Sequence, residues 1–181
     1  MSFAGLLLMD KHVERYLNDH HAGANGALQL IHQLAERQEI ESESLFFQNL
    51  EKMVEKDQSL LKDLLEKANI EKSLTLQIAG TLTEGAGRLK LLWEGLNPGE
   101  LGMFEALEVL ALGLQGKRLL WVMLGKLSPY FPEWATYDFA ELELQAIEQR
   151  DQIEERRIEA GCESLLDRQR YSQWAAKISR S

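Results

Sequence analysis

The sequence predicts a single all-α domain over residues 1–181, a bundle of four long amphipathic helices with a bridging segment in the middle and a short helix at the end. Three observations predict this class. Apolar residues recur three or four positions apart along most of the chain, which is the helical period. Leu, Glu, Gln, Lys and Ala are frequent and Pro occurs only three times, a composition that favours helices. No alternating strand pattern of useful length is present.

The first two helices are predicted at about residues 8–38 and 43–69. The apolar stripe of the first helix continues through His20, and Asp57 falls in the middle of the stripe of the second. Ser42 or Ser44 is expected to cap the second helix, because a serine hydroxyl accepts hydrogen bonds from the free N–H groups of a first turn. Only a few residues separate the two helices, so they must form an antiparallel hairpin.

Residues 70–97 differ from the flanking helices because several glycines weaken the helical period. We expect one or two short helices in a long crossover. Asn97 and Pro98 then supply an N-cap and a proline at the first helical position, a typical start signal. The third helix is therefore predicted at about residues 98–126.

The fourth helix is predicted at about 133–160, with Gly161 as the C′ glycine that ends it, and a short last helix is predicted at about 163–178. Aromatic residues gather around the turn between the third and fourth helices: Trp121, Tyr130, Phe131, Trp134 and Tyr137. We expect them to close one end of the bundle core. A surface for a partner or an apolar ligand is the alternative.

Charge and cysteine content restrict the classes of function. The net charge of −9 disfavours nucleic-acid binding through a broad basic face, because the phosphate backbone would be repelled. The single cysteine, Cys162, excludes an internal disulfide and is typical of a reducing compartment. The apolar segment Met1–Met9 is too short to span a bilayer and lacks the features of a signal peptide. We therefore expect a cytoplasmic protein with no membrane span.

The helix order of hairpin, long crossover and hairpin is that of ferritin-like four-helix bundles. The chain resembles bacterial ferritin-like proteins in this order and in its crossover, and the stretch Tyr16–Ala24 is similar to that of uncharacterised relatives in this broad group. Active members carry a Glu on two helices and a Glu-x-x-His on the other two, which together hold two iron ions. This sequence contains no Glu-x-x-His, so the ligands of the family cannot be assigned to its residues.

Several polar residues are nevertheless predicted to point into the bundle: His20, Asp57, Glu108 and Asp151 or Glu154. A buried charge needs a partner, so the expected arrangement is a His20–Asp57 pair whose members satisfy each other's hydrogen bonds. One alternative is a rearranged His/carboxylate site for iron, manganese or zinc that includes all of these residues. The other is that some of these positions face solvent.

We expect a non-catalytic scaffold or interaction module that has lost the di-iron site, needs no cofactor and self-associates through one helix face, as a homo-oligomer such as a dimer. A protein partner is compatible with this role. The alternative is a metal-binding or oxidoreductase ferritin-like protein with a rearranged ligand set, and a third option is a carrier for an apolar ligand held between the helices. No serine has a recognisable base and orienting carboxylate, so the sequence gives no support to nucleophilic catalysis.

Overall fold

The computed structural model describes residues 3–67 and 95–179 of the chain. These residues form α1 (Phe3–Arg37), α2 (Glu41–Lys67), α4 (Leu101–Leu127), two short 3-10 helices η1 (Ser128–Tyr130) and η2 (Pro132–Trp134), α5 (Phe139–Leu165) and α6 (Arg168–Ile178). The described residues contain no strand, so the all-α prediction is confirmed. Most of the predicted crossover, residues 70–94, lies outside the described part of the chain.

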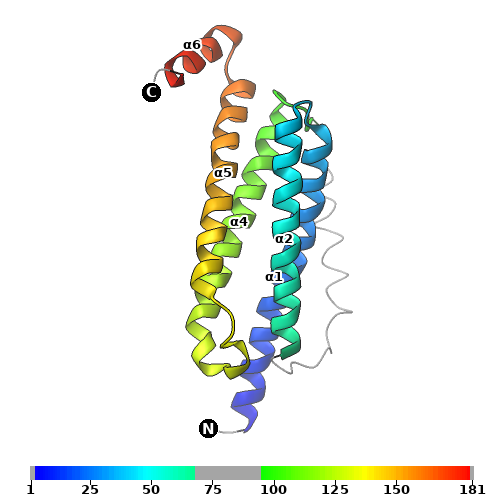
Figure 1. Cartoon of the computed structure of the whole chain (residues 1–181), viewed down its shortest axis with the longest axis vertical. Helices are drawn as coiled ribbons and strands as arrows, with labels where there is room; N and C mark the ends of the chain where they lie inside the picture. Colours follow the sequence, from blue (N-terminus) through cyan, green and yellow to red (C-terminus); the bar gives the residue numbers. More distant parts are fainter. Residues whose placement is uncertain (1–2, 68–94, 180–181) are drawn as a thin grey trace.

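The four long helices form two antiparallel hairpins that lie side by side (Figure 1). Helices α1 and α2 make one hairpin, α4 and α5 make the other, and α1 packs against α4. Helices α2 and α4 run in the same direction, and the last turn of α2 and the first turn of α4 lie at opposite ends of the bundle (Figure 1). Lys67, the last residue of α2, donates a hydrogen bond of 2.7 Å from its Nζ to the hydroxyl of Tyr137, which precedes α5.

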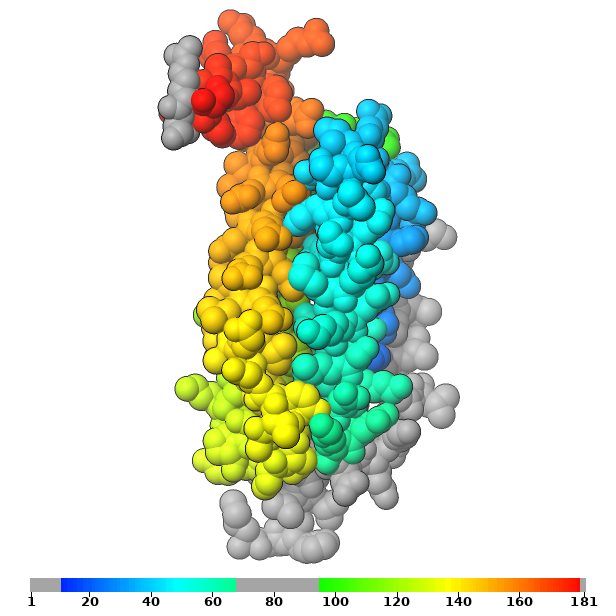
Figure 2. Space-filling model, viewed as in Figure 1, coloured from blue at the N-terminus to red at the C-terminus, as the bar shows by residue number. Residues whose placement is uncertain are grey.

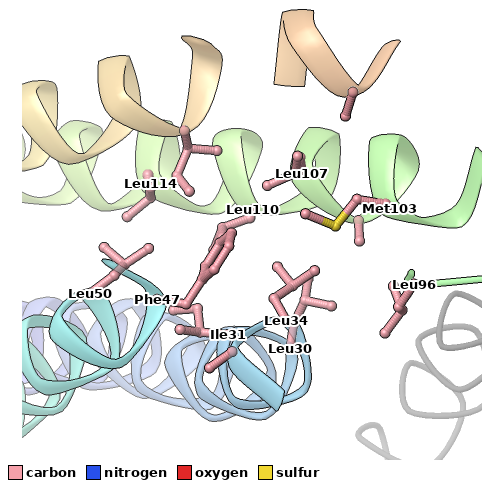
Figure 3. Close-up of a cluster of buried hydrophobic side chains, with 14 of the residues drawn as sticks. Leu30, Ile31, Leu34, Phe47, Leu50, Leu96, Met103, Leu107, Leu110 and Leu114 are labelled. Atoms are coloured by element: carbon pink, nitrogen blue, oxygen red, sulfur yellow. The ribbon is translucent and has the colours of Figure 1, made fainter. Parts of the chain in front are cut away.

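The core has two apolar clusters, one toward each end of the bundle. The first lies toward the turn between α1 and α2, where Phe47 of α2 and Leu34 of α1 are fully buried against Leu107 and Leu110 of α4. Figure 3 shows the Phe47 ring directed from its own hairpin toward α4. Full burial of such a side chain stabilises the fold by about 1.5–3 kcal/mol, so this cluster holds the two hairpins together.

The second cluster contains the aromatic residues around the turn between α4 and α5. Phe131 stacks on Trp134 with ring centroids 4.1 Å apart, and the buried Trp134 Nε1 donates to the Leu64 carbonyl of α2 at 3.2 Å. Trp121 is also fully buried in this cluster, whereas Tyr130 is 75% exposed. The prediction that the aromatic residues close one end of the core is confirmed for this group, apart from Tyr130.

Helix α4 begins three residues later than predicted. Gly99 adopts a positive φ of 83°, and the Glu100 N–H donates to the Asn97 carbonyl at 3.1 Å. Residues 97–100 therefore form a turn, and Glu100 is the N-cap residue in place of Asn97. The glycine explains the difference, since a left-handed residue interrupts a helix.

Helix α5 also differs from its predicted range of 133–160, because residues 132–134 are η2. The helix begins after Asp138, whose side chain accepts hydrogen bonds from two N–H groups of the first turn, as an N-cap aspartate does. The predicted C′ glycine, Gly161, instead lies inside α5 and is buried. A Cβ at Gly161 would lie 2.9 Å from a ring carbon of Phe104, so this glycine permits close packing of α4 on α5.

The predicted serine cap of α2 is wrong. Helix α2 begins at Glu41, and the Ile40 carbonyl accepts the first hydrogen bonds of the helix. Ser42 therefore lies inside the first turn. So does Ser44, whose hydroxyl donates to the Ala35 carbonyl of α1 at 2.9 Å.

Helix α6 is shorter than the predicted 163–178, because α5 extends to Leu165 and Asp167 caps the next helix by accepting from the Arg170 N–H. It buries none of its residues. Figure 2 shows α6 beyond the end of α5, away from the other long helices. None of the described helices combines the length and the apolar content that crossing a membrane requires.

Candidate functional site

Three polar residues interrupt the apolar interior between the two core clusters: Asp57 on α2, Lys117 on α4 and Gln149 on α5. Each follows one buried apolar residue by three positions and precedes another by four. That spacing places each side chain on the core face of its helix. The apolar stripes of three helices therefore bring these residues together inside the bundle.

Lys117 is the centre of this polar cluster. Its Nζ lies 2.6 Å from Asp57 Oδ2, and it also donates to Gln149 Oε1. Gln149 Nε2 in turn lies 3.5 Å from Met53 Sδ on α2. The side chains of Lys117 and Asp57 are only 13% and 10% exposed, so this is a largely buried ion pair that joins the two hairpins.

Burial and the neighbouring carboxylate have opposite effects on Lys117. Removal from water lowers the pKa of the ammonium below its ordinary value, and Asp57 opposes this effect by attraction and by its hydrogen bond. A buried ammonium needs such a partner because an unpaired charge in the core is strongly destabilising. The cluster is thus a polar contact satisfied by its own members.

A cavity of about 310 Å³ lies beside this cluster, between α1, α2 and α4. Its lining includes Asp57 and Lys117 together with His20 and Trp121. His20 is half-buried, and its ring packs edge-on against Tyr16 with centroids 4.8 Å apart. Burial lowers the pKa of His20 below its ordinary value, although the negative charge of the nearby Asp19 has the opposite effect. The imidazole is therefore uncharged at neutral pH.

The structure places only two of the predicted site residues at this cavity. His20 and Asp57 both line it, but the charged partner of Asp57 is Lys117. The predicted pairing of His20 with Asp57 is therefore wrong, and Lys117 takes the place of His20 in it. Sequence reasoning missed Lys117 and Gln149, although both carry the same signal as Asp57, a polar residue within an apolar stripe.

The other predicted residues form ion pairs away from the cavity. Glu154 pairs with Arg157 at 2.6 Å, and the exposed Glu108 lies 3.3 Å from the same guanidinium. The exposed Asp151 pairs with Arg150 at 2.5 Å. Arginines of α5 thus hold these carboxylates near solvent, where they have no contact with the core cluster.

These residues do not fit a di-iron centre. Such a centre needs several carboxylates and imidazoles that converge between the helices. In the described residues no group of three or more His, Cys, Asp or Glu side chains is placed to hold a metal ion. The buried carboxylate of Asp57 accepts from an ammonium at Oδ2, and the positive charge of that ammonium repels a metal cation.

Among the described residues that line the cavity there is no Ser, Thr or Cys, and Lys117 is engaged by two partners. In comparisons with models of protein families, with curated proteins and with solved structures, the chain matches none of them.

Proposed function

We propose that this chain is a non-catalytic, ferritin-like bundle module that functions by associating with a second copy of itself. In this proposal the cluster of Asp57, Lys117 and Gln149 takes the place of the metal ions that ferritin-like proteins hold between their helices. The observation that carries it is the 2.6 Å contact of Lys117 Nζ with Asp57 Oδ2. A buried cation already neutralises the carboxylate, so the bundle centre is satisfied without a metal.

The directions of the helices support the ferritin-like topology. Helices α2 and α4 run the same way and their consecutive ends lie at opposite ends of the bundle (Figure 1). Such a bundle needs one long connection between its second and third helices, as ferritin-like folds have. An up-down-up-down bundle would place these ends together.

The outward face of α4 supports self-association. Leu101, Leu112, Leu119 and Met123 are all exposed, between 47% and 72%. Successive members are eleven, seven and four positions apart, so they lie along one line on the helix surface opposite the core. An exposed apolar patch of this kind marks an interaction site.

A second copy of the chain fits this face when the two α4 helices cross antiparallel about a two-fold axis between residues 115 and 116. Such an interface is self-complementary. Leu112 then lies opposite Leu119 of the second copy, and Glu105 lies opposite Lys126. Glu108, which pairs with Arg157 of its own chain, lies opposite Met123. This charge complementarity favours a second copy over an unrelated partner.

Sedimentation equilibrium tests the association. The wild-type chain should be a dimer at micromolar concentrations, and Leu119→Glu should be a monomer because it places two carboxylates in an apolar interface. Leu144→Glu on α5 is the matched control, since Leu144 is 55% exposed and Leu119 54%, and it should stay dimeric.

Charge reversal tests the orientation. Glu105→Lys alone should weaken the dimer, and the double variant Glu105→Lys/Lys126→Glu should restore it. A monomeric wild type, or a dimer that Leu119→Glu leaves intact, would overturn self-association through α4.

A further inference from the structure

Helix α6 has an apolar face that the rest of its own chain does not bury. Tyr171, Trp174 and Ala175 are half-buried, and their spacing of three and four positions places them on one side of the helix. Tyr171 stacks on Trp174 with ring centroids 5.6 Å apart. Ile178 continues this face and is 52% exposed, and no residue of α6 is fully buried. Part of the face is therefore accessible to a partner.

The charged residues of α6 are all basic, in a chain whose net charge is −9. Arg168 lies on one side of the apolar face, and Arg170 and Lys177 lie on the other. Arg170 pairs with the N-cap Asp167 at 3.4 Å. Arg168 and Lys177 form no ion pair with any residue that the structure describes. A surface that fits α6 should therefore be acidic around a place for an aromatic ring.

The turn between α4 and α5 is such a surface. Residues 127–149 include five acidic residues and no Lys or Arg, and Glu133, Asp138 and Glu141 among them are exposed. An open groove of about 470 Å³ lies at this turn, with Asp138 and Phe139 in its lining. Since an engineered cavity of ~150 Å³ takes up benzene, the groove has room for the indole ring of a tryptophan.

The antiparallel dimer proposed above brings the two surfaces to the same level, and the inference rests on that proposed function. Within one chain, Phe104 in the first turn of α4 packs against Gly161 near the end of α5, and α6 begins soon after α5 ends. In the dimer the first turn of one α4 lies beside the last turn of the other. Helix α6 of each copy is therefore level with the turn between α4 and α5 of the second copy.

We infer that α6 of each copy docks on the turn between α4 and α5 of the second copy. Trp174 enters the groove of about 470 Å³, and Lys177 and Arg168 face the carboxylates around it. The two-fold axis repeats this contact at the other end of the dimer. An anionic membrane also has the charge that α6 requires, but the groove at the matching level favours the second copy.

Zero-length cross-linking of the wild-type dimer with a carbodiimide tests the contact, because it joins an amine only to a carboxylate that touches it. Lys177 is the only lysine after residue 126. Within one chain, the 27 residues of α5, about 40 Å of helix, separate it from the turn before α5. A cross-link from Lys177 to Glu133, Asp138 or Glu141 can therefore form only between two copies.

Mass spectrometry of the digested product should find this cross-link. Lys177→Arg, which keeps the charge and removes the amine, should lack it, and so should the monomeric Leu119→Glu. Cross-links of Lys177 only to Glu159 or Glu163, at the end of α5, would overturn the inference.

Sedimentation equilibrium measures the contribution of α6 to the association. Trp174→Ala should weaken the dimer roughly tenfold, as loss of an aromatic anchor does. The matched control Gln173→Ala, on the opposite side of α6, should leave the dimer unchanged. A dimer that Leu119→Glu dissociates and Trp174→Ala leaves unchanged would overturn this inference alone, whereas a monomeric wild type would overturn the proposed function as well.

A vesicle assay distinguishes the second copy from a membrane. The wild-type chain should not co-sediment with vesicles of phosphatidylcholine and phosphatidylserine in equal amounts. Co-sedimentation that Arg168→Glu abolishes would show that α6 binds an anionic membrane, and this result would also overturn the inference.

Discussion

Removal of one member of the buried ion pair should destabilise the bundle far more than removal of both. Asp57→Leu leaves the ammonium of Lys117, which is 13% exposed, without its carboxylate. Lys117→Met leaves the carboxylate of Asp57, which is 10% exposed, without its cation. Breaking a buried pair in this way costs about 3–5 kcal/mol, a large part of the roughly 5–15 kcal/mol that stabilises a domain.

The double variant Asp57→Leu/Lys117→Met replaces both charges by apolar side chains of similar length. Its free energy of unfolding should lie within about 1 kcal/mol of the wild type or above it, because exchange of a buried pair for apolar residues is often neutral or stabilising. Urea denaturation followed by circular dichroism measures all four proteins and gives the coupling energy.

Two results would refute this reasoning. Single variants that each cost less than about 1 kcal/mol would show a pair that behaves as if it were exposed to solvent. Strictly additive effects in the double variant would show that the two side chains do not interact.

Two further predictions concern packing and pH. Gly161→Ala should destabilise the fold by about 1–3 kcal/mol, because its Cβ would lie 2.9 Å from the Phe104 ring. Gly23→Ala, the matched helical control with open space around it, should stabilise the fold by about 0.5–1 kcal/mol, and thermal denaturation distinguishes the two. Burial lowers the pKa of His20 and His21 below their ordinary 6.5, so the unfolded chain binds more protons than the folded one just below that pH. Stability should therefore fall as pH decreases through 6.5, and this fall should be smaller in His20→Asn/His21→Asn when unfolding midpoints are compared between pH 7 and pH 5.

The helices were predictable because apolar spacing is a local property of the sequence. The helix ends were less so. Asn97 and Pro98 resemble a helix start, but the left-handed Gly99 delays it. Gly161 resembles a helix end, yet it lies inside α5 because the Phe104 ring packs where a Cβ would be. That contact joins two helices and is not visible in the residues next to Gly161.

The candidate site was predictable only in part. Asp57 was found because a carboxylate in an apolar stripe is conspicuous, and Lys117 was missed because its long side chain is usually able to reach solvent from such a position. Glu108 and Glu154 lie at the edges of their stripes, and Arg157 holds both near the surface. The cavity depends on which small residues of α1 and α4 face each other, and the sequence does not show this.

The central claim is that a lysine, and not a metal ion, satisfies the carboxylate inside this bundle. Elemental analysis of the purified wild-type chain, after incubation with iron, manganese and zinc and removal of unbound metal, tests it most directly. We expect less than stoichiometric metal, and the same residual amount in Asp57→Ala. Stoichiometric metal in the wild type that is lost in Asp57→Ala would contradict the claim.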